Sequence, residues 1–194
     1  MSTAKNPDIR RRDSHIFNRD AHDFYLEPQW CSERLFQVEP FDRQAPILDP
    51  CTGTGRVAQA AKAAGYRVLT AHIIDRGYPG CRVQDFLKRR TAPANVACNP
   101  PFNAVKAFAY HAFAIGASKV AMIFPVACLN AARPWLCELP FSHILLMTPR
   151  PSMPTGQHVL SGGHVGGDKR DFCWLIFEGD HVGEPRIRWL HRDE

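Results

Sequence analysis

Short apolar runs alternate with longer amphipathic stretches along most of this chain, and that alternation is the feature that most restricts its fold. Strand-like runs lie at residues 45–49, 67–74, 94–98 and 119–124, and helix-like stretches lie at residues 56–65 and 104–117. Gly65 and Gly116 stand where helix C-caps are expected. Strands that alternate with helices in this way predict an α/β fold built on a parallel sheet.

The sequence on either side of this core adds further elements. A short helix is predicted within residues 22–41, beginning near Pro28 and carrying the apolar side chains of Trp30, Leu35, Phe36 and Val38. Another is predicted over residues 127–138, kinked by Pro134. The runs at 142–148 and 171–178 are expected to be the last two strands, paired antiparallel at one edge of the sheet.

The connection between those last two strands is unusually long. Residues 149–170 are rich in glycine and proline, and a loop of this length in a compact domain is more often functional than a simple link. We therefore expect it to contact the substrate. Arg150, Lys169 and Arg170 are its candidate nucleic-acid contacts.

Composition favours one globular domain. The chain has 194 residues, of which 45% are hydrophobic and 22% charged, enough to bury a full core. Residues 1–21 are polar and arginine-rich and are predicted to be a flexible basic arm, with one domain over residues 22–194. No apolar run approaches the ~20 residues that cross a bilayer, and the start lacks the apolar stretch of a signal peptide, so a cytoplasmic protein without membrane association is expected.

Charge and cysteine spacing narrow the class of partner. The net charge is +5, and basic residues gather at Arg10–Arg12, Lys88–Arg90, Lys169–Arg170 and Arg186 with Arg188, a pattern that suits a polyanion. The seven cysteines include no Cys-x-x-Cys pair and have no metal-ligand spacing. We expect neither a disulfide framework nor a metal site.

A glycine loop follows the first strand of the core. Ile47 and Leu48 lead into Asp49-Pro50-Cys51-Thr52-Gly53-Thr54-Gly55, and a helix begins at about Arg56, so the backbone can approach a ligand closely at the two glycines. The spacing also fits a dinucleotide fingerprint, because Gly53-x-Gly55-x-x-Ala58 is followed about twenty residues later by Asp75. The glycines alone do not decide between a dinucleotide and another nucleotide-type ligand such as S-adenosylmethionine.

Asp49 separates these ligands by charge. A carboxylate at the strand end would repel a pyrophosphate but attract the ammonium group of a methionine moiety, which favours S-adenosylmethionine over NAD. The loop also lacks the Gly-Lys-Ser/Thr ending that binds triphosphates. An NAD-dependent oxidoreductase is therefore disfavoured and an NTPase more so.

A rigid turn follows the strand at 94–98. Asn99-Pro100-Pro101-Phe102 cannot continue a strand or a helix, because two successive prolines remove two donors and fix two φ angles. In a parallel sheet the carboxyl end of such a strand is where ligands bind.

Together the two segments resemble motifs I and IV of the S-adenosylmethionine-dependent amino-methyltransferases, and the chain looks most like the small phage-type adenine-N6 methyltransferases of DNA. The resemblance implies a Rossmann-like class I methyltransferase fold with a mostly parallel seven-stranded sheet, an antiparallel edge strand and helices on both faces. It covers most of the chain, since residues 22–28 are similar to the upstream motif that packs on the methionine part of the cofactor, here through Tyr25 and Pro28.

The resemblance also implies roles for individual residues. The loop residues Asp49, Pro50, Cys51, Gly53 and Gly55 would line the methionine end of the cofactor, and Asn99 would border the cofactor as well as the substrate. Asp85 and Phe86 resemble the pair that hydrogen-bonds and covers the adenine ring. The acid expected directly after the second strand is replaced by His72, and Asp75 is the candidate for holding the ribose hydroxyls instead.

The chemistry of an amino acceptor suits the Asn-Pro-Pro-Phe turn. An aromatic amino group is a weak nucleophile, so a catalyst must orient it beside the electrophilic methyl group. We expect the side-chain oxygen of Asn99 and the carbonyl of Pro100 to accept its two hydrogens, with Pro101 stiffening the turn and Phe102 stacking on a flipped-out base.

Other acceptors present the same planar amino group. RNA adenine and the glutamine amide of a protein remain alternatives to DNA adenine, and the basic clusters favour nucleic acid. A non-catalytic protein that binds cofactor or nucleic acid is a further alternative, because His72 stands where the ribose-binding acid is expected.

Overall fold

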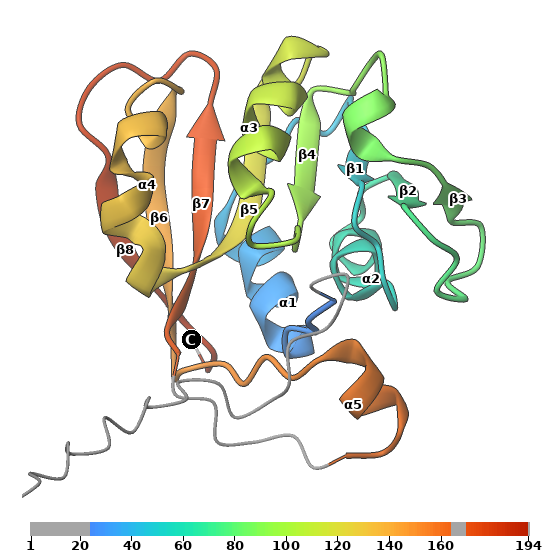
Figure 1. Ribbon diagram of the computed structural model, residues 1–194. Helices are drawn as coiled ribbons and strands as arrows, with labels where there is room; N and C mark the ends of the chain where they lie inside the picture. Colours follow the sequence, from blue (N-terminus) through green and yellow to red (C-terminus); the bar gives the residue numbers. More distant parts are fainter. Residues whose placement is uncertain (1–23, 164–169, 194) are drawn as a thin grey trace, which may run out of the picture.

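The computed structural model describes residues 24–163 and 170–193, in which helices cover both faces of one sheet (Figure 1). The strands are β1 (Ile47–Asp49), β2 (Val68–His72), β3 (Arg82–Val83), β4 (Asn95–Cys98), β5 (Lys119–Pro125), β6 (Phe141–Thr148), β7 (Phe172–Glu178) and β8 (Arg186–His191). The helices are α1 (Gln29–Val38), α2 (Arg56–Ala63), α3 (Val105–Ala114), α4 (Leu129–Leu136) and α5 (Gly156–Leu160), with short 3-10 turns η1 (Phe86–Lys88) and η2 (Val126–Cys128).

The sheet has eight strands in the order β3-β2-β1-β4-β5-β7-β6-β8. β1 to β5 run parallel, β7 is antiparallel to both of its neighbours, and β8 is parallel to β6. The mostly parallel sheet with helices on both faces is confirmed. Two details differ from the prediction: the sheet has eight strands rather than seven, and the antiparallel strand β7 lies near one edge, with β6 and β8 beyond it.

The strand count differs because the strands at the two edges of the sheet carry little sequence signal. In β8, Arg186 and Arg188 alternate with the exposed Ile187 and Trp189, and only Leu190 is fully buried. A strand at the edge of a sheet needs little apolar surface, so its apolar signal is weak. β3, two exposed residues long, is a second edge strand without a sequence signal.

Each face of the sheet packs against its own helices. α1 and α2 cover one face, and α3, α4 and η1 cover the other (Figure 1). Along β7, Trp174 and Ile176 point to the first face, whereas Leu175 and Phe177 point to the second. All four are fully buried, as expected of a strand between two others, and the Trp174 indole N–H donates to the Cys31 carbonyl at 3.0 Å.

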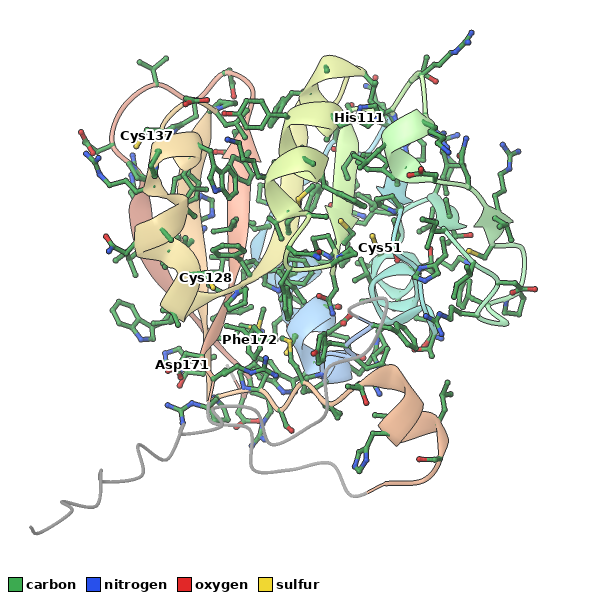
Figure 2. All side chains as sticks on the ribbon, viewed as in Figure 1. Cys51, His111, Cys128, Cys137, Asp171 and Phe172 are labelled. Carbon is green, nitrogen blue, oxygen red and sulfur yellow. The ribbon has the colours of Figure 1, made fainter. Side chains whose placement is uncertain are left out.

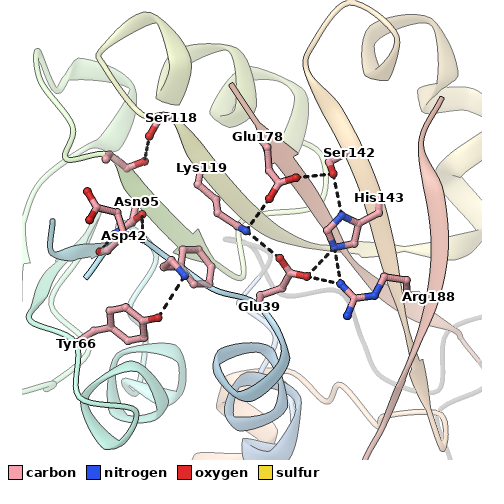
Figure 3. A network of polar contacts seen from close by, with 12 residues as sticks. Glu39, Asp42, Tyr66, Asn95, Ser118, Lys119, Ser142, His143, Glu178 and Arg188 are labelled. Atoms are coloured by element: carbon pink, nitrogen blue, oxygen red, sulfur yellow. Dashed lines mark hydrogen bonds and ion pairs between the residues drawn. The ribbon is translucent and has the colours of Figure 1, made fainter. Parts of the chain in front are cut away.

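A buried polar network joins the end of α1 to the sheet where β5 begins (Figure 3). The carboxylate of Glu39 accepts hydrogen bonds from Lys119 at 2.9 Å, His143 at 2.8 Å and Arg188 at 2.7 Å. Glu178, at the end of β7, accepts from Lys119 and from Ser142. Burial by itself raises the pKa of Glu39, but the hydrogen bonds from His143 and Lys119 outweigh it and lower the pKa to about 2.

This network should make the fold sensitive to acid. Because the folded-state pKa of Glu39 is depressed, the stability that the ionised carboxylate contributes is present above its ordinary value of 4.5 and is lost as the pH falls toward about 2. Glu39→Gln should lower the free energy of unfolding at neutral pH by about 1–3 kcal/mol and flatten its pH dependence in that window. Chemical denaturation across the pH range measures both, with exposed Glu33→Gln in α1 as the matched control. An unchanged pH profile in Glu39→Gln would contradict the assignment.

Candidate functional site

A cavity of about 660 Å³ opens where β1 and β4 end. It is lined by Phe24, Tyr25, Leu26, Glu27, Pro50, Cys51, Thr52, Gly53, Arg56, Val57, His72, Ile73, Asp85, Phe86, Leu87, Asn99, Pro101, Asn103, Ala104 and Phe108. Cys51, on its wall, is labelled in Figure 2. The structure thus brings the upstream segment, the glycine loop, the end of β2, η1 and the Asn-Pro-Pro-Phe turn to one place.

The glycine loop is packed too tightly for side chains at its glycines. Gly53 and Gly55 have positive φ values of 52° and 92°. A Cβ atom on Gly53 would lie 2.7 Å from the Phe24 ring, and one on Gly55 would lie 2.0 Å from the Tyr78 ring. Gly53 lines the cavity, whereas Gly55 faces Tyr78 outside it, so the two glycines serve different contacts.

Asp49 lies beneath the cavity rather than on its wall. Its side chain is 1% exposed, and its Oδ1 accepts from the backbone N–H of Cys51 at 3.1 Å. Its Oδ2 is buried and accepts no hydrogen bond within the described residues. Burial raises the pKa of Asp49 well above its usual value, and the charge of Glu27 raises it further. Beneath the cavity there is therefore a carboxyl oxygen that no described residue hydrogen-bonds.

The amide of Asn99 is held in one orientation. Its Nδ2 donates to the Tyr25 carbonyl at 2.9 Å and to Glu27 Oε2 at 2.8 Å. Because the Tyr25 carbonyl can only accept, the nitrogen must face it and Oδ1 must face away. Among the described residues nothing donates to Oδ1 of Asn99 or to the carbonyl of Pro100, so two acceptors remain available at the turn.

Glu27 is the functional side chain that the sequence interpretation missed. It is 3% exposed, holds Asn99, and accepts from Ser32 at 3.1 Å. Burial raises its pKa, and hydrogen bonds, including that from Asn99, offset only part of the shift. A charged residue inside the otherwise apolar Phe24-Tyr25-Leu26-Glu27-Pro28 segment was the available signal, since buried charges are rare without a partner.

Arg56 was missed as well. It is the first residue of α2, where a positive charge is disfavoured by the helix dipole, so its presence there indicated a local partner. Its guanidinium donates to the backbone carbonyl of Glu27 and lines the cavity. The cavity thus carries buried carboxyl groups and one cation close together.

The aromatic side chains of the turn and the upstream segment pack on each other. Phe102 does not line the cavity but stacks on Tyr25, with ring centres 5.6 Å apart and an angle of 11°. Phe172, labelled in Figure 2, contacts its ring at 5.6 Å. The role of Phe102 against a base stays a prediction. Pro28 caps the amino end of α1 and does not reach the cavity wall, and neither does Pro100.

The long connection packs against the upstream segment. Tyr25 pairs with Thr155 in an isolated antiparallel bridge, and the Gly156 N–H donates to the Phe24 carbonyl at 2.7 Å. A Cβ atom on Gly156 would lie 1.9 Å from the Phe24 ring. Part of this connection therefore supports a wall of the cavity.

The two candidates for the ribose hydroxyls occupy different places. His72 ends β2, lines the cavity and accepts the Gly53 N–H through Nδ1 at 3.3 Å. Asp75 is exposed outside it and accepts from the Gly77 N–H at 2.8 Å. Asp85 and Phe86 both line the cavity, where Asp85 caps η1 through Leu87.

Two of the three predicted nucleic-acid contacts, Arg150 and Arg170, do not line the cavity. Arg150 forms a two-point ion pair with Asp171 at 2.7 and 3.2 Å, and Asp171 is labelled in Figure 2. Arg170 lies over the rings of Tyr25 and Phe172 at 5.6 and 5.5 Å. Lys169, Arg10–Arg12 and the arm at 1–21 lie outside the described residues.

Two further observations concern the described residues. Within residues 24–163 and 170–193, no three His, Cys, Asp or Glu side chains are grouped to hold a metal ion. In the same part of the chain, no helix combines the length and apolar character that crossing a membrane requires.

Sequence comparison identifies no relative: neither a protein-family model nor a curated protein matches the chain. Solved structures do resemble it. A putative RNA methyltransferase from Pyrococcus horikoshii has 18% identity and a TM-score of 0.56 over 77% of this chain and 80% of its own. A predicted O-methyltransferase from Agrobacterium tumefaciens has 16% identity and a TM-score of 0.53 over 82% of this chain and 85% of its own.

Another neighbour is a modification subunit of a putative type I restriction enzyme from Vibrio vulnificus. It has 13% identity and a TM-score of 0.57 over 93% of this chain but 48% of its own, so the chain spans about half of that subunit. At these identities the likeness establishes the fold. The chain has the Rossmann-like fold of S-adenosylmethionine-dependent methyltransferases.

Proposed function

We propose that this chain transfers a methyl group from S-adenosylmethionine to the exocyclic amino group of adenine in DNA. The observation that carries the proposal is the oriented amide of Asn99, which turns its oxygen away from Tyr25 and Glu27. A hydrogen-bond acceptor next to the Pro100 carbonyl, in the cavity that the glycine loop lines, is suited to a planar amino group.

The residues of the cavity fit the cofactor. A methionine moiety has an ammonium and a carboxylate group. The cavity wall offers Glu27 for the first, with the carboxyl group of Asp49 buried beneath it, and Arg56 for the second. Ile73 and Leu87 line the cavity although they are 56% and 42% exposed, and a purine ring would cover such apolar surface. Asp85 lies in the same wall, where its carboxylate can accept a hydrogen bond from the amino group of that purine.

The protein contributes position rather than covalent chemistry. When bound, S-adenosylmethionine supplies a methyl group on a positively charged sulfur. Asn99 Oδ1 and the Pro100 carbonyl accept the two hydrogens of the target amino group, which orients its nitrogen and excludes water from it. An adenine in a duplex must first leave the stack, at a cost of a few kcal/mol, and we propose that Phe102 offsets part of this cost.

Two observations support DNA as the acceptor. The chain is basic, with clusters at Lys88–Arg90 and at Arg186 with Arg188. Its structural neighbours include modification subunits of type I restriction systems. A putative RNA methyltransferase and a ribosomal protein L11 methylase share the fold, so RNA adenine and a protein amide are the alternatives.

The test is incubation with methyl-labelled S-adenosylmethionine and three acceptors in parallel: duplex DNA, RNA and a protein extract. Label recovered from DNA as N6-methyladenine is the expected result. Label only in RNA or only in protein would overturn the acceptor while leaving the cofactor in place. No labelled product combined with tight cofactor binding would favour a non-catalytic binding protein.

His72 and Asp75 give a matched pair for the ribose site. Since only His72 lines the cavity, His72→Ala should weaken S-adenosylmethionine about 2- to 10-fold, the range for one hydrogen bond of about 0.5–1.5 kcal/mol. Asp75→Ala should leave the dissociation constant unchanged. Isothermal titration calorimetry measures both, and the reverse order of effects would assign the ribose to Asp75.

A further inference from the structure

A second pocket, of about 510 Å³, lies on the outer side of the glycine loop. Its walls are Thr54, two side chains of α2 (Gln59 and Lys62) and residues 76–79. Two of its lining side chains, Lys62 and Arg76, are cations, and none is acidic. The remaining polar groups include a hydroxyl, an amide and a phenol, all of which can donate hydrogen bonds.

Arg76 forms no ion pair with any residue that the structure describes. Its guanidinium lies over the Phe24 ring, with Cζ 4.2 Å from the ring centre. Its Nε and Nη2 are buried and have no hydrogen-bond partner within the described residues. The neighbouring Asp75 bonds the Gly77 N–H instead and forms no ion pair with Arg76 in that part of the chain. A cation shielded from water without an anion is costly, and a bound anion removes that cost.

Lys62 completes the charge of the pocket. Its ammonium donates to the Tyr78 hydroxyl at 3.1 Å and lies 5.3 Å from the centre of the Tyr78 ring. Tyr78 is in turn packed against Gly55, so there is no room for a side chain at position 55. Lys62 makes no ion pair with any described residue, so its charge also faces the pocket uncompensated.

The pocket adjoins the main cavity across a shared wall. Phe24 lines the main cavity with one part of its ring and carries Arg76 on its face. Thr54 lines the second pocket and follows Gly53, which lines the first. A polyanion with a base in the main cavity therefore passes close to the second pocket.

We propose that this pocket binds a backbone phosphate of the nucleic-acid acceptor, through Arg76 and Lys62. The inference rests on the proposed function, because it assumes a polynucleotide in the neighbouring cavity. The contact is independent of sequence and fixes the register of the strand relative to Asn99. A planar guanidinium held on an aromatic ring is well placed to meet phosphate oxygens.

The salt dependence of DNA binding tests the pocket. Each phosphate that a protein neutralises adds about 0.9 to the slope of log K against log salt for duplex DNA. The double variant Lys62→Gln with Arg76→Gln should lower that slope by about 1 and weaken binding equally for different sequences. Over the range from about 50 to 200 mM salt, its dissociation constant should change about fourfold less than that of the wild type.

Three controls make the result specific. Arg76→Lys retains the charge and should retain the slope. Arg133→Gln removes an exposed cation on α4 and should change the slope less than the double variant. Melting temperature and S-adenosylmethionine affinity should stay at wild-type values in all variants, which separates loss of the pocket from loss of the fold.

The outcomes distinguish this pocket from the proposed function. Wild-type binding to DNA with an unchanged slope in the double variant would overturn the pocket alone. Loss of cofactor affinity in the double variant would assign the pocket to the cofactor and overturn the proposal that it binds a backbone phosphate. A rise in the melting temperature of the wild type with inorganic phosphate, without any binding of DNA or RNA, would overturn both the polynucleotide ligand and the proposed acceptor.

Discussion

Replacing Asn99 by alanine is expected to abolish methyl transfer, with a loss of about 10³-fold in kcat and little change in cofactor affinity. The amide oxygen is one of two acceptors that the structure leaves open at the turn, and removing one oriented hydrogen-bonding group from a dry site costs roughly 10²–10³ in rate. The loss should lie at the upper end, because the shortened side chain also leaves the Glu27 carboxylate and the Tyr25 carbonyl without their shared donor.

Single-turnover kinetics with DNA, together with calorimetric titration of S-adenosylmethionine, separate these effects. Asn130→Ala, an exposed asparagine on α4, is the matched control and should retain wild-type turnover. Unchanged turnover in Asn99→Ala would remove the turn from the chemistry. Lost turnover combined with lost cofactor binding would instead assign Asn99 to the cofactor alone.

Replacing Glu27 should affect binding and rate together. Glu27→Ala removes the carboxylate proposed for the cofactor's ammonium group and the partner that orients Asn99. Each hydrogen bond to a charged group contributes about 1.5–3 kcal/mol, so the combined loss in kcat/KM should be about 10²- to 10⁴-fold. Glu27→Gln keeps an acceptor for Asn99 and loses only the charge, so its loss should fall mainly on cofactor affinity.

The pH dependence of cofactor binding gives Glu27 an independent readout. Burial raises the pKa of both Glu27 and Asp49, and each carboxyl must be ionised to attract an ammonium group. Affinity should therefore rise with pH through the raised pKa values and level off above them. The rise should be smaller in Glu27→Gln than in the wild type. A profile that is flat in both proteins would contradict an ammonium contact at these carboxyls.

Much of the fold and part of the site follow from local sequence. The α/β alternation predicted β1, β2, β4, β5 and the helices between them, because apolar period and glycine caps are local signals. The glycine loop and the Asn-Pro-Pro-Phe turn were placed at strand ends, and the parallel topology then brings them to one cavity.

The unpredicted parts depend on contacts between distant segments. Glu27 and Asn99 meet across 72 positions, and nothing in either segment alone indicates that the carboxylate fixes the amide. Asp49 is the acidic residue expected at the strand end but lies beneath the cavity wall, a depth that one strand's sequence does not reveal. The position of β7 inside the sheet likewise depends on its pairing with both β5 and β6, which the sequence of one strand does not reveal.

The strand order determines which parts of the sheet can form while the chain is being synthesised. β6 leaves the ribosome before β7, yet its neighbours in the finished sheet are β7 and β8, both made later. A nascent chain that ends before Phe172 therefore presents the apolar edges of β5 and β6 with no native strand to cover them. The connection between β6 and β7 also contains Gly156, which packs against Phe24 in the cavity wall. Ligand binding should accordingly be absent from the emerging chain until Gly156 and β7 have been made, so the ribosome-bound protein is the form most exposed to misassembly.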